Sequence, residues 1–305
     1  MASFRRGINL CGPEFGETVL PGVPGTHYTW NSEPTFRYFA AHGLDLFRIP
    51  VLWERLQPAA FGPLAPDYLE GLRANLAWAA AAGGSVVLDV HNFARYYGVP
   101  LTGPAPLADL WVRLSAEFRG HPALYAYGLM NEPHDLGPAD WRAISQSVLD
   151  AIRDAGDPTL IMVPGDAWSS AARWPEVHGP ASWIRDPAAN FAYEAHLYFD
   201  DGSGRYPDPY SDSDARHAPA RLAAFLDWCR DNAVRPYLGE YGVPSTDLRW
   251  LPVLDAFLTA LDAAGCDGTC WAAGEWWGDY PLSVQPLDDG APRPQFPVLT
   301  AHLGA

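Results

Sequence analysis

Two glutamates that each follow a short apolar run are the residues of this chain best suited to chemistry. Glu132 lies near the end of 127–133, Tyr-Gly-Leu-Met-Asn-Glu-Pro, and Glu240 follows Tyr237-Leu238-Gly239. Hydrolysis of a glycosidic bond needs one protonated carboxyl group for the leaving oxygen and one ionised carboxylate for the anomeric carbon. We therefore predict a retaining glycoside hydrolase, whose two carboxyl groups stand about 5–5.5 Å apart. A strand-end cap or a salt bridge is the structural alternative for either glutamate alone.

The elements that must position these glutamates form a repeating pattern of strands and helices. Short apolar runs alternate with longer helical patterns along all 305 residues, without a linker or a repeat of fixed period. The predicted strands are Ile8–Leu10, Leu46–Ile49, Val86–Val90, Leu124–Leu129, Leu160–Val163, Phe191–Ala195, Pro236–Gly239 and Gly268–Ala272. The predicted helices include Pro66–Ala82, Leu107–Phe118, Pro138–Ala155, Pro219–Asn232 and Trp250–Ala264.

Eight such units predict an α/β protein with a single (β/α)8 TIM barrel, one catalytic domain over residues 1–305. For Trp168–Pro187, rich in Pro and Trp, we expect loops and short helical turns. Catalytic side chains of such barrels stand at the C-terminal ends of the strands, so Glu132 and Glu240 would face each other across the mouth. Arg48, in Leu46-Phe47-Arg48-Ile49-Pro50, would keep a nucleophilic glutamate ionised.

Six motifs in order make this chain resemble glycoside hydrolase family 5, the cellulase family. The similarity runs from Arg6-Gly7-Ile8-Asn9 to Trp276-Trp277-Gly278-Asp279-Tyr280. The motifs are Phe47-Arg48-Ile49-Pro50, Asp89-Val90-His91-Asn92, Asn131-Glu132-Pro133, Glu194-Ala195-His196-Leu197-Tyr198, Gly239-Glu240-Tyr241-Gly242 and Trp271. Each motif alone is weak evidence, but six in the family's order at barrel spacing are strong evidence.

The resemblance implies a role for each matched residue. Glu132 would be the general acid/base and Glu240 the nucleophile, the second held ionised and oriented by Arg48 and Tyr198. Asn131 would bond the sugar 2-OH, a contact that strengthens in the transition state. The resemblance also implies that His91, with Asn92, binds the central sugar, that His196 sets the proton of the acid/base, and that Trp271 forms the floor. Without the resemblance, a core histidine bonded to backbone is the ordinary interpretation of His91 or His196, and Tyr198 would be a core residue.

Further aromatic residues are expected to line outer sugar subsites. Trp30, Trp53, Trp168, Trp276 and Trp277 follow or lie near predicted strand ends, and burial in the barrel shell is the alternative for each. Glu275, between Trp271 and the Trp pair, would contact a neighbouring sugar or pair with an arginine. The acidic stretch 199–214 is expected to be a solvated cleft loop, because it lacks the ligand spacing of a calcium site.

The composition excludes several classes of partner. The net charge is −16, from 36 acidic residues against 20 basic residues that are all arginine, which argues against nucleic acid and anionic membranes. No apolar run reaches the roughly 18 residues of a membrane-spanning helix. No signal peptide follows Met1, so the protein would stay inside the cell or the leader is absent from this chain. We expect a monomer.

Cysteine and histidine spacing gives no sign of a metal. The four cysteines, Cys11, Cys229, Cys266 and Cys270, include no Cys-x-x-Cys pair, and a Cys229–Cys266 bridge stays open. A metal-dependent barrel hydrolase is the minor alternative, since His91 and His196 lie in no zinc motif. The predicted reaction needs no cofactor, because carboxylates supply both proton transfer and substitution.

The substrate is the least determined part of the prediction. An endo-acting cellulase that cleaves β-1,4-glucan leads, and a β-mannanase or a bacterial exopolysaccharide-processing β-glycosidase on the same scaffold is the alternative. A carbohydrate-binding barrel without turnover is the alternative of another class. Such a protein would usually have lost one carboxylate, and here Glu132 and Glu240 are both present.

Overall fold

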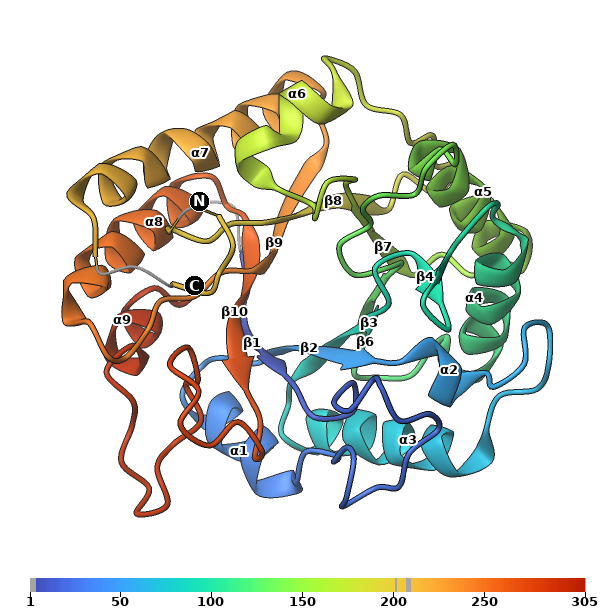
Figure 1. Cartoon of the computed structure of the whole chain (residues 1–305), viewed down its shortest axis with the longest axis horizontal. Coiled ribbons are helices and arrows are strands. Elements are labelled where there is room, and N and C mark those ends of the chain that lie inside the picture. The colour runs from blue at the N-terminus through green and yellow to red at the C-terminus, as the bar shows by residue number, and fades with distance from the viewer. Residues whose placement is uncertain (1–3, 201, 207–209, 305) are drawn as a thin grey trace.

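A computed structural model describes residues 4–200, 202–206 and 210–304, and its centre is a closed barrel of eight parallel strands (Figure 1). In order around the barrel the strands are β1 (Arg6–Leu10), β10 (Asp267–Ala273), β9 (Arg235–Glu240), β8 (Phe191–His196), β7 (Leu160–Pro164), β6 (Leu124–Gly128), β3 (Ser85–Val90) and β2 (Leu46–Val51). The predicted (β/α)8 fold is confirmed, and every predicted strand lies within two residues of the observed bounds.

Helices surround the barrel on the outside (Figure 1). The helical elements are α1 (Glu33–Ala41), α2 (Trp53–Leu56), α3 (Pro66–Ala81), α4 (Ala105–Phe118), α5 (Trp141–Asp154), η1 (Ala171–Arg173), α6 (Trp174–His178), α7 (Asp212–Asp231), η2 (Leu248–Trp250), α8 (Leu251–Ala263) and α9 (Phe296–Ala301). A two-stranded hairpin of β4 (Arg95–Tyr96) and β5 (Val99–Pro100) follows β3.

Two helix starts differ from the prediction for local reasons. The helix predicted from Pro138 begins at Trp141, because the Asp140 side chain accepts a hydrogen bond from the backbone of Arg142 and caps the first turn. The helix predicted from Pro219 begins already at Asp212 and contains Pro219. The expected loop to residue 214 is therefore too long, and within it Asp201 lies outside the described residues. The segment 168–187 has the expected short turns, η1 and α6.

The inside of the barrel is packed with side chains. Alternate strand residues point inward and form one buried cluster, while their neighbours pack against the helices. The inward cluster is Leu46, Val87, Ala126, Leu160, Met162, Ala192 and Tyr237. Polar side chains at the C-terminal mouth therefore stand on a filled apolar floor, which limits the positions that they can adopt.

The four cysteines are all buried and free, so the Cys229–Cys266 bridge that the sequence left open is not formed. Across the described part of the chain, none of the helices combines the length and the apolar character that crossing a membrane requires.

Candidate active site

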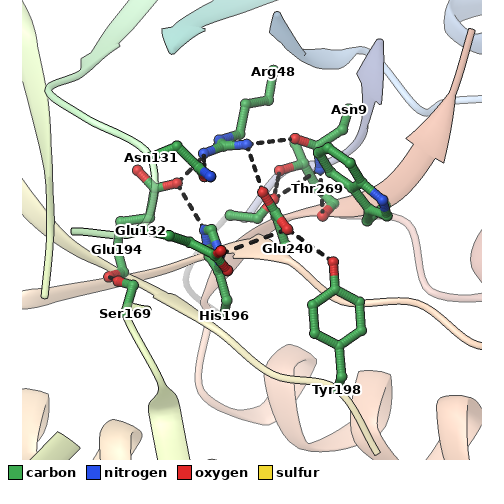
Figure 2. Close-up of polar contacts among 12 residues, drawn as sticks. Asn9, Arg48, Asn131, Glu132, Ser169, Glu194, His196, Tyr198, Glu240 and Thr269 are labelled. Carbon is green, nitrogen blue, oxygen red and sulfur yellow. Dashed lines mark hydrogen bonds and ion pairs between the residues drawn. The ribbon is translucent and has the colours of Figure 1, made fainter. Parts of the chain in front are cut away.

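The two predicted glutamates meet at the C-terminal mouth of the barrel (Figure 2). Glu132 comes shortly after β6 and Glu240 is the last residue of β9. A carboxylate oxygen of Glu132, a ring nitrogen of His196 and a carboxylate oxygen of Glu240 lie within 4.8 Å of one another. This spacing fits the retaining geometry of about 5–5.5 Å and is too short for the inverting geometry, which needs about 6.5–9.5 Å for a water molecule.

Arg48, on β2, is the fully buried centre of the site (Figure 2). Its Nη1 lies 3.1 Å from Oε1 of Glu240 and donates to Oδ1 of Asn9 at 2.9 Å. Its Nη2 donates to Oδ1 of Asn131 at 2.8 Å. The guanidinium also lies 3.1 Å from a carboxylate oxygen of Asp89 and 3.0 Å from one of Glu194. One buried cation thus contacts three carboxylates, and a variant without the guanidinium would leave these buried negative charges without their shared partner.

The second partner of Glu240 is Tyr198. Its hydroxyl donates to Oε2 of Glu240 at 2.8 Å. Burial, together with the negative charge of Glu240, raises the pKa of the Tyr198 phenol well above its usual value. Tyr198 therefore remains a hydrogen-bond donor over the working pH range. Arg48 and Tyr198 occupy one oxygen each of Glu240, which orients the carboxylate and stabilises its negative form.

Glu132 has a strained backbone conformation. Its φ of 41° lies in the left-handed region, which is uncommon for a residue with a side chain. Its Oε1 lies 2.7 Å from Nδ1 of His196, whose Nε2 lies 3.3 Å from Oε1 of Glu194. Burial alone would lower the pKa of His196, but the carboxylates of Glu240, Glu132 and Glu194 raise it to about 10. His196 is therefore a cation near neutral pH and donates to Glu132.

The trio of Glu132, His196 and Glu240 has the spacing of a metal site, but its chemistry favours proton transfer. A metal ion needs the lone pair of a neutral imidazole. Both ring nitrogens of His196 face carboxylates, and the protonated ring has no lone pair to offer.

Asn131 and His91 form the floor of the site with Trp271. Because Arg48 occupies Oδ1 of Asn131, its Nδ2 points to Nε2 of His91 at 3.2 Å. Nδ1 of His91 lies 2.8 Å from Asp89, and its ring stacks on Trp271 with centroids 5.6 Å apart. Both nitrogens of His91 thus have protein partners, so this residue orients Asn131, and its predicted sugar contact is not evident from the geometry.

Two predicted subsite residues are buried away from the cleft. Asn92 accepts from the backbone of Trp53 and donates to Glu54. Trp53 is fully buried and donates to Gln57. The predictions that Asn92 and Trp53 contact a sugar are therefore wrong. Trp30 packs on Tyr68 and against Gly71 of the outer helix α3 but is only partly buried, so its subsite role stays a prediction.

The aromatic residues after β10 do gather near Trp271. Trp277 packs edge-on against Trp271, with ring centroids 6.0 Å apart, and stacks on Tyr280 at 4.3 Å. Trp276 is exposed, which leaves its ring free for solvent or ligand. Among the described residues, no arginine forms an ion pair with Glu275. It accepts from the backbone of Ser32 and the hydroxyl of Thr35, at the start of α1.

The prediction from sequence gave no role to Asp89, Glu194 or Asn9. Glu194 lies two residues before His196 on β8, and Asp89 lies two residues before His91, which directly follows β3; residues i and i+2 of an extended chain share one face. The spacing Asp-x-His and Glu-x-His could therefore have identified Asp89 and Glu194 as site residues from the sequence. Asn9 donates to the carbonyl oxygen of Gly239 at 2.9 Å and so ties β1 to β9, the strand of Glu240.

Gly239 is required by this arrangement. A Cβ at this position would lie 2.1 Å from Oε1 of Glu194. Only a residue without a side chain lets Glu194 reach both Arg48 and His196 across β9.

Glu14 is a further buried carboxyl group near the site, in the loop after β1. Its Oε2 accepts from the backbone of Gly12 at 2.8 Å. Burial raises the pKa of Glu14 from 4.5 to about 7, although the charge of His91 opposes this change. The folded protein therefore keeps a proton that the unfolded chain loses above about pH 4.5.

The sign of this shift predicts a pH-dependent loss of stability. The contribution of Glu14 to the free energy of unfolding is fully present below about pH 4.5. It falls by about 3 kcal/mol as the pH rises to about 7. Urea unfolding of the wild type and of Glu14→Gln, at about pH 4.5 and 8, should show the variant gaining relative stability at the higher pH. Glu17→Gln, an exposed neighbour, is the control. An equal difference between wild type and Glu14→Gln at both pH values would contradict the prediction.

Comparisons with known proteins agree with this geometry. The model of the family described as cellulase, glycosyl hydrolase family 5, matches residues 11–277. Endo-beta-1,4-glucanase A of Emericella nidulans is 32% identical over 285 residues, which cover 92% of this chain and 86% of that protein.

Solved structures are similar over nearly the whole chain. Endoglucanase Cel5A of Pseudomonas stutzeri in complex with cellobiose has a TM-score of 0.92 and 36% identity, covering 98% of this chain and 92% of the other. XacCel5A in complex with cellopentaose has the same TM-score and identity, covering 99% and 100% of the two chains.

Proposed function

Because the chain belongs to the cellulase family, glycoside hydrolase family 5, we propose that it is a retaining endo-β-1,4-glucanase in which Glu132 and Glu240 carry the reaction. The observation that carries the proposal is the pair of close carboxylates, one bound by Arg48 and Tyr198 and the other by His196. We also propose that residues 1–305 act as one catalytic domain. The ligand is a β-1,4-glucan chain or oligosaccharide, in line with the cellobiose and cellopentaose held by the two related enzymes.

In the first step the bond between the anomeric carbon and the glycosidic oxygen breaks. Glu132, protonated on Oε2 while Oε1 accepts from His196, donates that proton to the departing oxygen, and a carboxylate oxygen of Glu240 forms a bond to the anomeric carbon from the opposite side. Arg48 and Tyr198 keep Glu240 negative and aimed until the attack. The product is a covalent glycosyl-enzyme with inverted configuration at that carbon.

In the second step Glu132, now ionised, takes a proton from a water molecule. The water oxygen attacks the anomeric carbon, the bond to Glu240 breaks, and a second inversion restores the β configuration. Protonated His196 stabilises the ionised form of Glu132 between the two steps. The Nδ2 group of Asn131 has two hydrogens, and the one that does not face His91 is available to the sugar 2-OH.

A substrate screen tests the proposed activity. Reducing sugar should be released from carboxymethylcellulose and lichenan at rates at least about tenfold above those from galactomannan and xylan, since each lost subsite contact costs about a factor of ten or more. Early loss of viscosity before much sugar is released would establish internal cleavage. Preferred release from galactomannan would overturn the glucan assignment in favour of a mannanase, and no release from any polymer would favour a binding barrel.

A further inference from the structure

A hollow beside Glu132 is not used by the steps above. Its volume is about 470 Å³, and it lies between the loops after β7 and β8 and the helix α7. Its wall includes the arginines Arg173, Arg205 and Arg221 together with Trp168. We call it the arginine pocket.

The arginine pocket has the opposite charge to the rest of the molecule. The chain has 36 acidic and 20 basic residues, yet Glu132 is the one acidic residue among the described residues that line this pocket. Arg221 donates to the backbone oxygen of Asp200 at 2.6 Å, which fixes its position. Arg173 contacts Glu176 at 3.1 Å in a pair that is more than half exposed on both sides and therefore weak.

The loop that carries Arg205 is ordered by a buried carboxylate. Asp200 is 6% exposed and accepts from the backbone of Gly202, Gly204 and Tyr206. Both carboxylate oxygens of Asp200 thus bind backbone amides of this loop. Within the described ranges, no carboxylate forms an ion pair with Arg205, which lies exposed at the pocket edge.

The arginine pocket lies on the leaving-group side of the bond to be cleaved. Glu132, His196 and Tyr198 line it, whereas Glu240 and Trp271 do not. A general acid contacts the oxygen between the sugar that is attacked and the sugar that leaves. Space that adjoins the acid and excludes the nucleophile therefore belongs to the leaving sugar.

Trp168 supplies a stacking surface there. Its side chain is 46% exposed and its ring is held by stacking on His134, with centroids 4.4 Å apart. An indole face that is fixed on one side and exposed can pack against the C–H face of a pyranose ring. The pocket thus offers one apolar face for a sugar and guanidinium groups around it.

We propose that the arginine pocket is a leaving-group subsite for a sugar that carries a carboxylate, so that the preferred substrate is an acidic β-glucan or its oligosaccharide. Guanidinium groups bind carboxylates by paired, charge-assisted hydrogen bonds. A chain with a net charge of −16 would otherwise repel such a polyanion, and Arg173 and Arg205 provide positive charge where the leaving sugar must bind. This inference rests on the proposed glucanase function and narrows its substrate class.

The test compares cellopentaose with the same pentasaccharide whose reducing-end glucose is replaced by glucuronate, and it follows cleavage of the bond next to that residue, which places the carboxylate-bearing pyranose in the leaving-group subsite. For the wild type at low ionic strength, kcat/KM should be about tenfold higher for the acid, and the ratio should fall towards one in about 0.5 M NaCl. In the double variant Arg173→Gln/Arg205→Gln the ratio should be about one at low salt. Arg230→Gln, which removes an exposed arginine of α7 that lies outside the pocket lining, should keep the wild-type ratio.

The outcomes separate this inference from the proposed function. A wild-type ratio near one, or a double variant that keeps the wild-type ratio, overturns the acidic subsite while cleavage of cellopentaose upholds the glucanase. Failure to cleave either compound overturns the glucanase itself. A high ratio that salt does not reduce also overturns the inference, because an exposed charge contact must be screened.

Discussion

Glu240→Gln is expected to lower kcat on cellopentaose by about 10⁵-fold and to leave the fold intact. The amide has the shape of the carboxylate, but its weakly nucleophilic oxygen does not form the covalent intermediate. Arg48 keeps two carboxylate partners, Asp89 and Glu194, so the loss of Glu240 does not leave the guanidinium unpaired. Oligosaccharide release measures the rate, and circular dichroism with thermal unfolding measures the fold.

A second variant identifies the role of Glu240 chemically. Glu240→Ala leaves room for azide, which should attack an activated aryl β-cellobioside directly and give the α-glycosyl azide by a single inversion. Glu33→Gln, at the exposed start of α1, is the matched control and should keep full activity. Near-normal activity of Glu240→Gln, or a β-glycosyl azide from Glu240→Ala, would refute the assignment of the nucleophile.

Glu132→Ala is expected to show an effect that depends on the leaving group. With cellopentaose the departing sugar needs a proton, so kcat/KM should fall by about 10³-fold. A dinitrophenyl group leaves without a proton, so the first step on dinitrophenyl β-cellobioside should proceed and the glycosyl-enzyme should accumulate, because no base activates water. A rapid burst of dinitrophenol followed by a slow steady rate would report this behaviour.

Azide again distinguishes the two roles. In Glu132→Ala it should speed the slow steady phase and yield the β-glycosyl azide, because the nucleophile remains and two inversions occur. His196→Asn would test the support of Glu132 by the imidazole and should change the pH profile of kcat/KM on cellopentaose. If Glu132→Ala lost activity equally on both substrates, a proton-transfer role would be untenable.

The barrel could be predicted from sequence because its signal is repeated eight times. Each apolar run is short and is followed by a helix or a helical turn, so an error in one unit does not change the predicted fold. Among the predicted helices, the start of α7 was predicted least accurately, because Pro219 suggested a helix start and the acidic residues before it suggested a loop.

Side-chain direction explains which site residues could not be placed. His91 and Asn92 are adjacent, and the structure turns the first to Trp271 and the second outward to Trp53 and Glu54. Trp53 begins α2 directly after β2, so its indole turns into the protein to meet Gln57 and Tyr96. A position near a strand end in the sequence predicts that a residue lies at the mouth of the barrel, but it does not predict the direction in which the side chain points.

The contact between Gly239 and Glu194 makes two distant positions dependent on each other. A mutational library that varies position 239 alone would sample variants in which the carboxylate on the neighbouring strand is displaced from Arg48 and His196. A library that varies position 194 alone would leave space beside Gly239 that only a joint change could fill. In an engineering or evolutionary sense the two residues are one unit, 45 positions apart along the chain, and substitutions there should be designed and scored as pairs.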